Sequence, residues 1–118
     1  MGQGRWVDLK KRTKKFALRV INLYRALPKA REAQRIGDQL LRSGMSVGAN
    51  FREATRARSG AEFATKANVS LMELDETTYW FELLEKAQII AAARLSPLKK
   101  EAEELIAIFV TIIKNAKL

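Results

Sequence analysis

The chain has 118 residues, and its 22 lysines and arginines outnumber 13 aspartates and glutamates to give a formal net charge of +9. It has no cysteine and no histidine, which excludes disulfides, thiolate catalysis and the usual zinc or iron–sulfur ligand sets. Hydrophobic residues make up 47% of a chain with only two prolines and six glycines. We therefore expect one domain with its own core and no turn-rich β fold.

A first helix is predicted over residues 7–27, where apolar side chains recur at steps of three and four residues with one gap at Thr13. Pro28 ends this helix, because proline lacks the N–H that would continue the hydrogen bonding. Residues 1–6 are predicted to form a disordered or extended tail outside a single domain of residues 7–118. The predicted core positions are Leu9, Phe16, Val20, Leu23 and Leu27.

A second helix is predicted over residues 32–57. Gly44 and Gly48 stand in its middle, where each glycine costs about 1 kcal/mol of helix propensity relative to alanine. We therefore expect the backbone of another helix to approach closely at this point. The predicted core positions are Leu40, Gly44, Val47, Phe51 and Ala54.

A third helix is predicted over residues 60–92. It starts with a capping box, in which Ser59 and Glu62 each satisfy a free backbone N–H. Its apolar and small residues again recur at helical spacing and predict one buried face. The predicted core positions are Phe63, Ala67, Ser70, Leu74, Thr77, Phe81 and Leu84.

A fourth helix is expected to begin with Ser96 as its cap and Pro97 in its first position. Its apolar residues follow a regular 4-3-4-3 spacing, which is typical of a seam in a helical bundle. Four such helices predict an all-α fold, an up-and-down antiparallel four-helix bundle. The predicted core positions of the fourth helix are Leu98, Ala102, Leu105, Phe109 and Ile112.

Apolar side chains also lie off the main stripes of the first and fourth predicted helices. A lone bundle would leave them half exposed, so we expect a homo-oligomer; scattered exposed apolar residues are the ordinary alternative. The longest apolar run, residues 105–113, is less than half of the ~20 residues that span a bilayer. No signal peptide is recognisable, so we expect a cytoplasmic protein without membrane contact. The residues off the stripes are Leu18, Ile21, Tyr24, Ile106, Ile108, Val110 and Ile113.

Basic residues concentrate at the start of the chain. The first 35 residues hold eleven basic residues against Asp8 and Glu32, a net charge of +9, whereas residues 59–87 carry a net charge of −4. Clustered basic charge is typical of nucleic-acid binding, here mostly to phosphates because no base-reading motif is present. Docking on an acidic protein, or less readily on a membrane surface, would use the same charge. The candidate nucleic-acid-binding residues are Lys10, Lys11, Arg12, Lys14, Lys15, Arg19, Arg25, Lys29, Arg31 and Arg35.

Polar residues form a second stripe along the second and third predicted helices. We expect a structural network in which Arg42 and Asn50 pair with Glu73 or Glu76 and fix the register of the helices. Two carboxylates three residues apart would also suit a magnesium ion or acid–base catalysis, but a di-iron bundle needs histidines that the chain lacks. We therefore predict a non-enzyme with no catalytic residue, metal or cofactor. The network residues are Arg42, Asn50, Glu53, Glu73 and Glu76.

The run of residues 39–54, QLLRSGMSVGANFREA, resembles the hallmark helix of a bacterial four-helix-bundle family, the 23S rRNA-intervening-sequence proteins. The resemblance covers nearly the whole chain beyond the first six residues. It extends to Arg12-Thr13 before Phe16-Ala17, to Glu62-Phe63, to residues 71–84 with Tyr79-Trp80, and to residues 101–105.

The same fold family includes the accessory variability determinant proteins of diversity-generating retroelements, which are basic pentameric bundles that bind nucleic acid and a reverse transcriptase. The resemblance implies a ring-like homopentamer of four-helix bundles, RNA or DNA as the ligand, and a retroelement reverse transcriptase as a further partner. Because fold transfers within a family more readily than function, two hypotheses stay open. One is a non-catalytic, homo-oligomeric RNA- or DNA-binding accessory protein; the other is a structural or protein-docking bundle with no nucleic-acid role.

Overall fold

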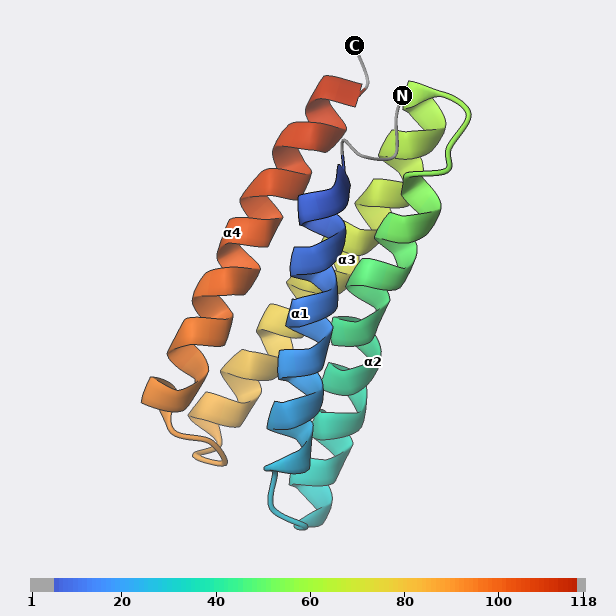
Figure 1. Ribbon diagram of the computed structural model, residues 1–118. Helices are drawn as coiled ribbons and strands as arrows, with labels where there is room; N and C mark the ends of the chain where they lie inside the picture. Colours follow the sequence, from blue (N-terminus) through green and yellow to red (C-terminus); the bar gives the residue numbers. More distant parts are fainter. Residues whose placement is uncertain (1–5, 117–118) are drawn as a thin grey trace.

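Four helices follow one another in the computed structural model, which describes residues 6–116: α1 (Val7–Arg25), α2 (Arg31–Ala54), α3 (Gly60–Lys86) and α4 (Ala92–Ala116). Successive helices run in opposite directions and form a rod of 46 × 20 × 19 Å (Figure 1). Residues 6–116 contain no strand. The predicted all-α fold of four helices is therefore confirmed.

The chain enters the bundle at Trp6, one residue earlier than predicted. The Trp6 ring stacks on Phe63 with centroids 5.1 Å apart and meets the edge of Phe51 at 5.7 Å. Trp6 therefore belongs to the domain and not to the predicted tail. Residues 1–5, the rest of that tail, lie outside the described part of the chain.

Ser59 caps α3 as predicted, since its hydroxyl accepts a hydrogen bond from the N–H of Glu62 at 3.0 Å. The returning bond differs from the expected capping box. The Glu62 carboxylate accepts from the N–H of Arg58 at 3.4 Å, one residue before the cap. The two bonds together fix the direction in which the chain turns from α2 into α3.

The boundary between α3 and α4 also differs from the prediction. α3 ends at Lys86 because Gln88 has a left-handed φ of 59° and Ile89 donates its N–H back to the carbonyl of Leu84. This hydrogen bonding commonly ends helices, usually with glycine in the left-handed position. α4 then begins at Ala92, within a run of alanines that favours helix. Ser96 is consequently not its cap, and Pro97 lies inside the helix.

The core is built around four fully buried rings, one from each helix: Phe16, Phe51, Phe81 and Phe109. Phe51 and Phe109 meet edge to face with centroids 5.4 Å apart, which joins α2 to α4 across the bundle. Edge-to-face pairs contribute stability beyond the area that they bury. The aromatic centre therefore ties together helices that are not neighbours in sequence.

Packing settles two details of the predicted core stripes. Thr13, the gap in the first stripe, is buried, and its hydroxyl donates to the carbonyl of Leu9 at 2.9 Å, so its polar atom is satisfied. On α4 the prediction was wrong at one position. Ile113, four residues after the buried Phe109, is buried, and Ile112 is half-buried at the edge of the core.

Gly44 and Gly48 allow α1 to approach α2 closely, although side-chain atoms of Val20 and Thr13, and not the predicted backbone, lie nearest to them. A Cβ atom at Gly44 would lie 2.8 Å from Cγ1 of Val20, and one at Gly48 would lie 3.2 Å from the hydroxyl oxygen of Thr13. Both distances are shorter than the ~3.5–4 Å of a comfortable contact. The two glycines therefore determine how closely the first two helices pack.

α1 and α4 close the bundle less tightly than the other neighbouring helices. In Figure 1 the two helices diverge toward the end where α4 begins. No helix within residues 6–116 is long and apolar enough to cross a membrane.

Candidate nucleic-acid interface

One side of α1 faces the core, and its lysines and arginines spread over the rest of its surface. Residues one step apart on a helix point about 100° away from each other, so the consecutive basic residues of α1 do not share one face. The structure divides the ten predicted basic residues into four places. These are a groove between α1 and α2, the outer face of α1, the seam between α1 and α4, and the connection between α1 and α2.

A shallow groove of about 250 Å³ runs between α1 and α2 on the outside of the bundle. Lys10 and Lys14 border it from α1, Arg52 borders it from α2, and Met45 forms part of its apolar lining. We call this depression, with its cations Lys10, Lys14 and Arg52, the basic groove. Because Gly48 brings the two helices together, cations from both helices border the same depression. Arg52 was missing from the predicted set, although it lies one helical turn after Gly48 on the same side of α2.

Lys11 and Lys15 continue the positive charge across the exposed outer face of α1. Leu18 follows them on this face and is 55% exposed. The other predicted residues surround the connection between α1 and α2 at the far end of the helix, and all are exposed: Arg25, Lys29, Arg31 and Arg35. The structure therefore brings a line of cations along the outside of α1, with an apolar side chain in its middle.

Arg12 does not join this surface. Its guanidinium donates to the two carboxylate oxygens of Glu101 at 2.7 and 3.1 Å and to Glu104 at 3.2 Å, so α4 offsets its charge. The hydrogen bond to Glu101 raises the pKa of Arg12 above its ordinary value. The structure therefore removes Arg12 from the predicted phosphate contacts and makes it a tie between α1 and α4.

Arg19 also faces α4, about two turns farther along the helix. It borders a separate cleft with Arg94, which the sequence analysis did not single out. Arg19 is therefore set apart from the basic groove, on the other side of α1. The signal for this division is helical spacing, because Arg12 and Arg19 are seven residues apart and lie on one side of the helix.

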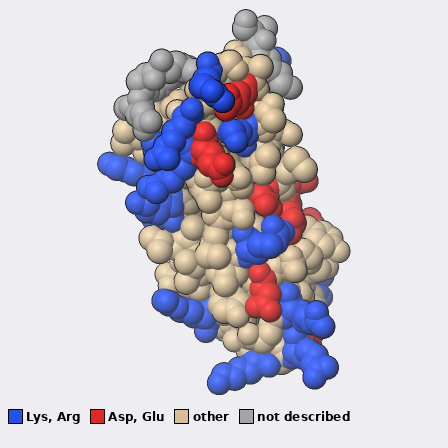
Figure 2. All heavy atoms as spheres, turned by 90° about the vertical axis from the view of Figure 1, so that its right-hand side faces the viewer, with Lys and Arg blue, Asp and Glu red and all other residues tan. Residues whose placement is uncertain are grey.

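Acidic side chains gather on the opposite side of the molecule. Figure 2 looks onto the side of the bundle where α2 lies, and basic side chains gather at its left and lower margins while acidic ones lie toward the middle and right. α3 provides more acidic residues than any other helix, six of the 13 in the chain, with Asp75 and Glu82 exposed on its surface. The outer surface of α1 is therefore mostly basic and that of α3 mostly acidic, as the charge distribution along the sequence predicted.

The predicted polar network is centred on Arg42. Its guanidinium donates to Glu73 at 3.2 and 3.3 Å and to Glu76, and the indole N–H of Trp80 donates to Glu76 at 3.0 Å. The bond from Arg42, assisted by that from Trp80, lowers the pKa of Glu76, and the same bond raises the pKa of Arg42. The two carboxylates therefore connect α2 to α3.

Two residues of the predicted network lie outside it. Asn50 donates to the carbonyl of Ser46 within α2 at 2.8 Å, and Glu53 meets Lys66 of α3 at 3.8 Å. Asn50 lies about two helical turns and Glu53 about three turns from Arg42, so neither side chain reaches the ion pairs that Arg42 makes with α3. Within residues 6–116, no group of three acidic, histidine or cysteine side chains is placed to hold a metal ion.

Residues 6–111 match the sequence profile of the 23S rRNA-intervening sequence protein family. Among solved structures, this one is similar to a protein of unknown function from the S23 ribosomal protein family of Bacteroides thetaiotaomicron. The two share 38% sequence identity with a TM-score of 0.83, over 89% of this chain and 97% of the other. No curated protein matches the chain.

Proposed function

The chain belongs to the 23S rRNA-intervening sequence protein family, and we propose that it is a non-catalytic, nucleic-acid-binding accessory protein that works as a homo-oligomer. The observation that carries this proposal is the line of cations along α1, joined by Arg52 from α2 at the basic groove. Such a surface attracts the phosphates of a nucleic acid whatever its base sequence, and binding releases the counterions of those phosphates. RNA and DNA both present this chemistry.

A non-catalytic role is supported by the state of the carboxylates. Glu73 and Glu76 are the acidic pair best spaced for acid–base work, and both are engaged by Arg42. A general base needs a raised pKa near the working pH, whereas the pKa of Glu76 is lowered. We expect Glu73→Gln and Glu76→Gln to change the stability of the fold and no turnover.

The test of nucleic-acid binding is a triple charge reversal, Lys11→Glu, Lys14→Glu and Arg52→Glu, compared with a matched control. The control reverses Lys86, Lys100 and Lys114, which are also exposed and lie on α3 and α4. Both variants change the net charge by the same amount. We expect the first to abolish binding of labelled RNA and duplex DNA in gel shifts and the control to weaken it only slightly, with unchanged helical circular dichroism. Equal loss in both variants would contradict the proposed surface.

Homo-oligomerisation is supported by apolar side chains that the single chain leaves uncovered. Leu18 of α1 and Val110 of α4 are 55% and 49% exposed. α3 adds an outer stripe that the sequence analysis missed, with Met72 63% and Tyr79 51% exposed. Patches of this kind mark interaction sites more often than isolated surface residues do. The family resemblance points to a ring-like homopentamer, which we adopt as the proposed assembly.

Light scattering after gel filtration measures this assembly directly. The proposed homopentamer has five times the 13.4 kDa chain mass, and a charged residue at Met72 or Tyr79 is expected to shift the mass toward that of the single chain. A wild-type mass of 13.4 kDa at micromolar concentration would contradict the proposal.

A second candidate is a protein-docking bundle, with a retroelement reverse transcriptase as one partner suggested by the resemblance. The exposed stripe on α3 and the acidic charge beside it favour a protein contact on that face. A pull-down that survives nuclease treatment, by a protein with no affinity for naked nucleic acid, would favour this candidate over the first.

A further inference from the structure

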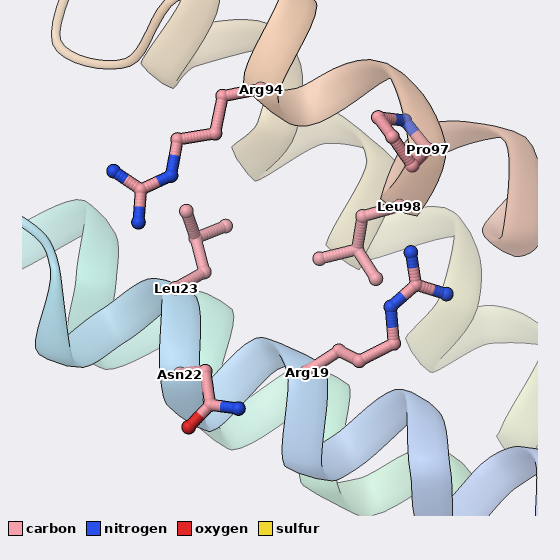
Figure 3. Close-up of a pocket in the computed structure, with 6 residues that line it drawn as sticks. All are labelled: Arg19, Asn22, Leu23, Arg94, Pro97 and Leu98. Carbon is pink, nitrogen blue, oxygen red and sulfur yellow. The ribbon is translucent and has the colours of Figure 1, made fainter.

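A cleft of about 270 Å³ lies between α1 and α4, near the end of the bundle where α4 begins. Its apolar floor is formed by Leu23 of α1 and Leu98 of α4, each only 6% exposed, and Pro97 borders it. Figure 3 shows the two leucine side chains reaching into the gap from opposite helices. The volume is close to the lower end of small-molecule sites, ~300 Å³, so it suits one small unit and not a large ligand.

Two arginines stand at opposite ends of this floor. In Figure 3, Arg94 extends from α4 toward α1, and Arg19 extends from α1 toward α4. No carboxylate lines the cleft, and neither arginine makes an ion pair with any residue in the described range 6–116. Arg12, about two turns away in the same seam, does have its carboxylates on α4. The seam is therefore neutralised at one end and left positive at the other.

Two cations separated by an apolar floor match a particular ligand chemistry. Guanidinium groups bind phosphates through paired N–H donors, and a sugar or an unstacked base offers an apolar surface between successive phosphates. A single strand presents this pattern at every nucleotide, whereas a duplex keeps its bases inside. Single-strand binding sites combine positive charge with side chains against which unstacked bases lie, most often aromatic ones. In this cleft Leu23 and Leu98 supply the apolar surface.

We propose that the α1–α4 cleft binds one nucleotide of a single-stranded nucleic acid, with successive phosphates on Arg19 and Arg94 and the sugar and base against Leu23 and Leu98. This inference rests on the proposed nucleic-acid binding and extends it. The basic groove on the other side of α1 holds phosphates of either single or double strands, and the cleft adds a preference for single strands.

The test compares the double variant Arg19→Gln/Arg94→Gln with the control Lys100→Gln/Lys114→Gln. The control removes the same charge from exposed positions of α4 outside the cleft. We expect the double variant to bind a labelled single-stranded decamer about a hundredfold more weakly than wild type, because it loses one charged hydrogen bond at each of two phosphates. The control is expected to lose less than about threefold, and binding of a duplex is expected to fall equally in both variants. Equal affinity of the two variants for the decamer would overturn the inference.

A second measurement gives its main result on wild-type protein, so that result does not depend on the variants folding. Adenosine 3′,5′-bisphosphate, the smallest unit with two phosphates around one nucleoside, is titrated into wild-type protein whose leucine methyl groups are labelled for NMR. We expect the methyl signals of Leu23 and Leu98 to shift with this probe and with the decamer, and not to shift with the probe in the double variant. Signals that stay in place during saturating decamer binding would overturn the inference while the proposed function stands.

Two other outcomes separate the proposals. If wild-type protein binds neither decamer nor duplex but the bisphosphate shifts both methyl signals, the proposed function fails and the nucleotide chemistry of the cleft is supported. If the double variant instead loses its oligomeric state and the bisphosphate moves nothing, the arginines meet acidic groups of a second copy, and the inference is wrong.

Discussion

Replacing Gly44 with alanine tests the close packing of α1 on α2. The added Cβ atom would lie 2.8 and 2.9 Å from the two methyl carbons of Val20 and 3.1 Å from its Cβ atom. Comfortable carbon contacts are about 3.5–4.0 Å, so the helices would have to separate by roughly 0.7 Å. Val20 is fully buried, and a valine in a helix has essentially one rotamer, so its side chain has no room to move aside.

Two opposing terms set the size of the effect. Overpacking of a core costs about 1–3 kcal/mol, whereas alanine in place of glycine returns about 1 kcal/mol of helix propensity. We therefore expect Gly44→Ala to lower the free energy of unfolding by about 1 kcal/mol, a drop in melting temperature of roughly 4 °C. Urea unfolding followed by circular dichroism measures this, at one fixed protein concentration because assembly would couple to stability.

The same change in a Val20→Ala background supplies the control. Without the valine methyl groups the clash disappears, so Gly44→Ala is expected to stabilise that background by about 1 kcal/mol. The coupling energy between the two positions is then about 2 kcal/mol. A Gly44→Ala protein more stable than wild type, or a coupling energy near zero, would refute the account of how α1 packs on α2.

Three further changes test other parts of the structure. The pKa of Glu76 is lowered, so its ion pair with Arg42 stabilises the fold at a pH above the ordinary pKa of 4.5, and this stabilisation is lost as the pH falls through the folded-state pKa. The difference in unfolding free energy between wild type and Glu76→Gln is therefore expected to shrink from pH 7 to about pH 3. A difference that stays constant with pH would contradict this ion pair. Gln88→Gly relieves a left-handed residue and is expected to add roughly 0.5 kcal/mol in thermal unfolding, whereas a loss would argue against that backbone. Phe109→Ala empties the aromatic centre and is expected to cost about 3–5 kcal/mol in urea unfolding; a cost under ~1 kcal/mol would contradict its burial.

Helical periodicity predicted most of the fold. The apolar stripes identified the four helices, and the two mid-helix glycines indicated the contact between α1 and α2. The boundary between α3 and α4 escaped prediction because Gln88, not a glycine, takes the left-handed position that ends α3. Nothing in the local sequence marks glutamine for that role. The N–H groups of Ile89 and Ile90 both donate to the carbonyl of Leu84, and the Ile90 side chain is buried, so hydrogen bonds and tertiary packing together stabilise the turn.

The candidate surface was predictable only in part. The sequence located the basic charge on the first helix, but the prediction grouped consecutive basic residues into one patch, whereas the helix points them in different directions. Arg12 meets Glu101, which is 89 residues away, and no local pattern indicates that contact. Arg52 borders the basic groove and Arg94 borders the α1–α4 cleft, each beside residues of another helix. Such contacts between distant segments depend on how the helices are arranged, so the sequence alone did not reveal them.

The measurement that tests the central claim most directly is the affinity of wild-type protein for labelled single-stranded RNA and duplex DNA across a salt series. The exposed cations of α1 and Arg52 of α2 predict several phosphate contacts, each adding about 0.9 to the slope of log affinity against log salt for a duplex and about 0.7 for a single strand. We expect a slope steeper than about −3 and tight binding at low salt. A slope near zero, or no binding at ~50 mM salt where phosphate contacts are strongest, would contradict a nucleic-acid role and leave protein docking as the function of the basic surface.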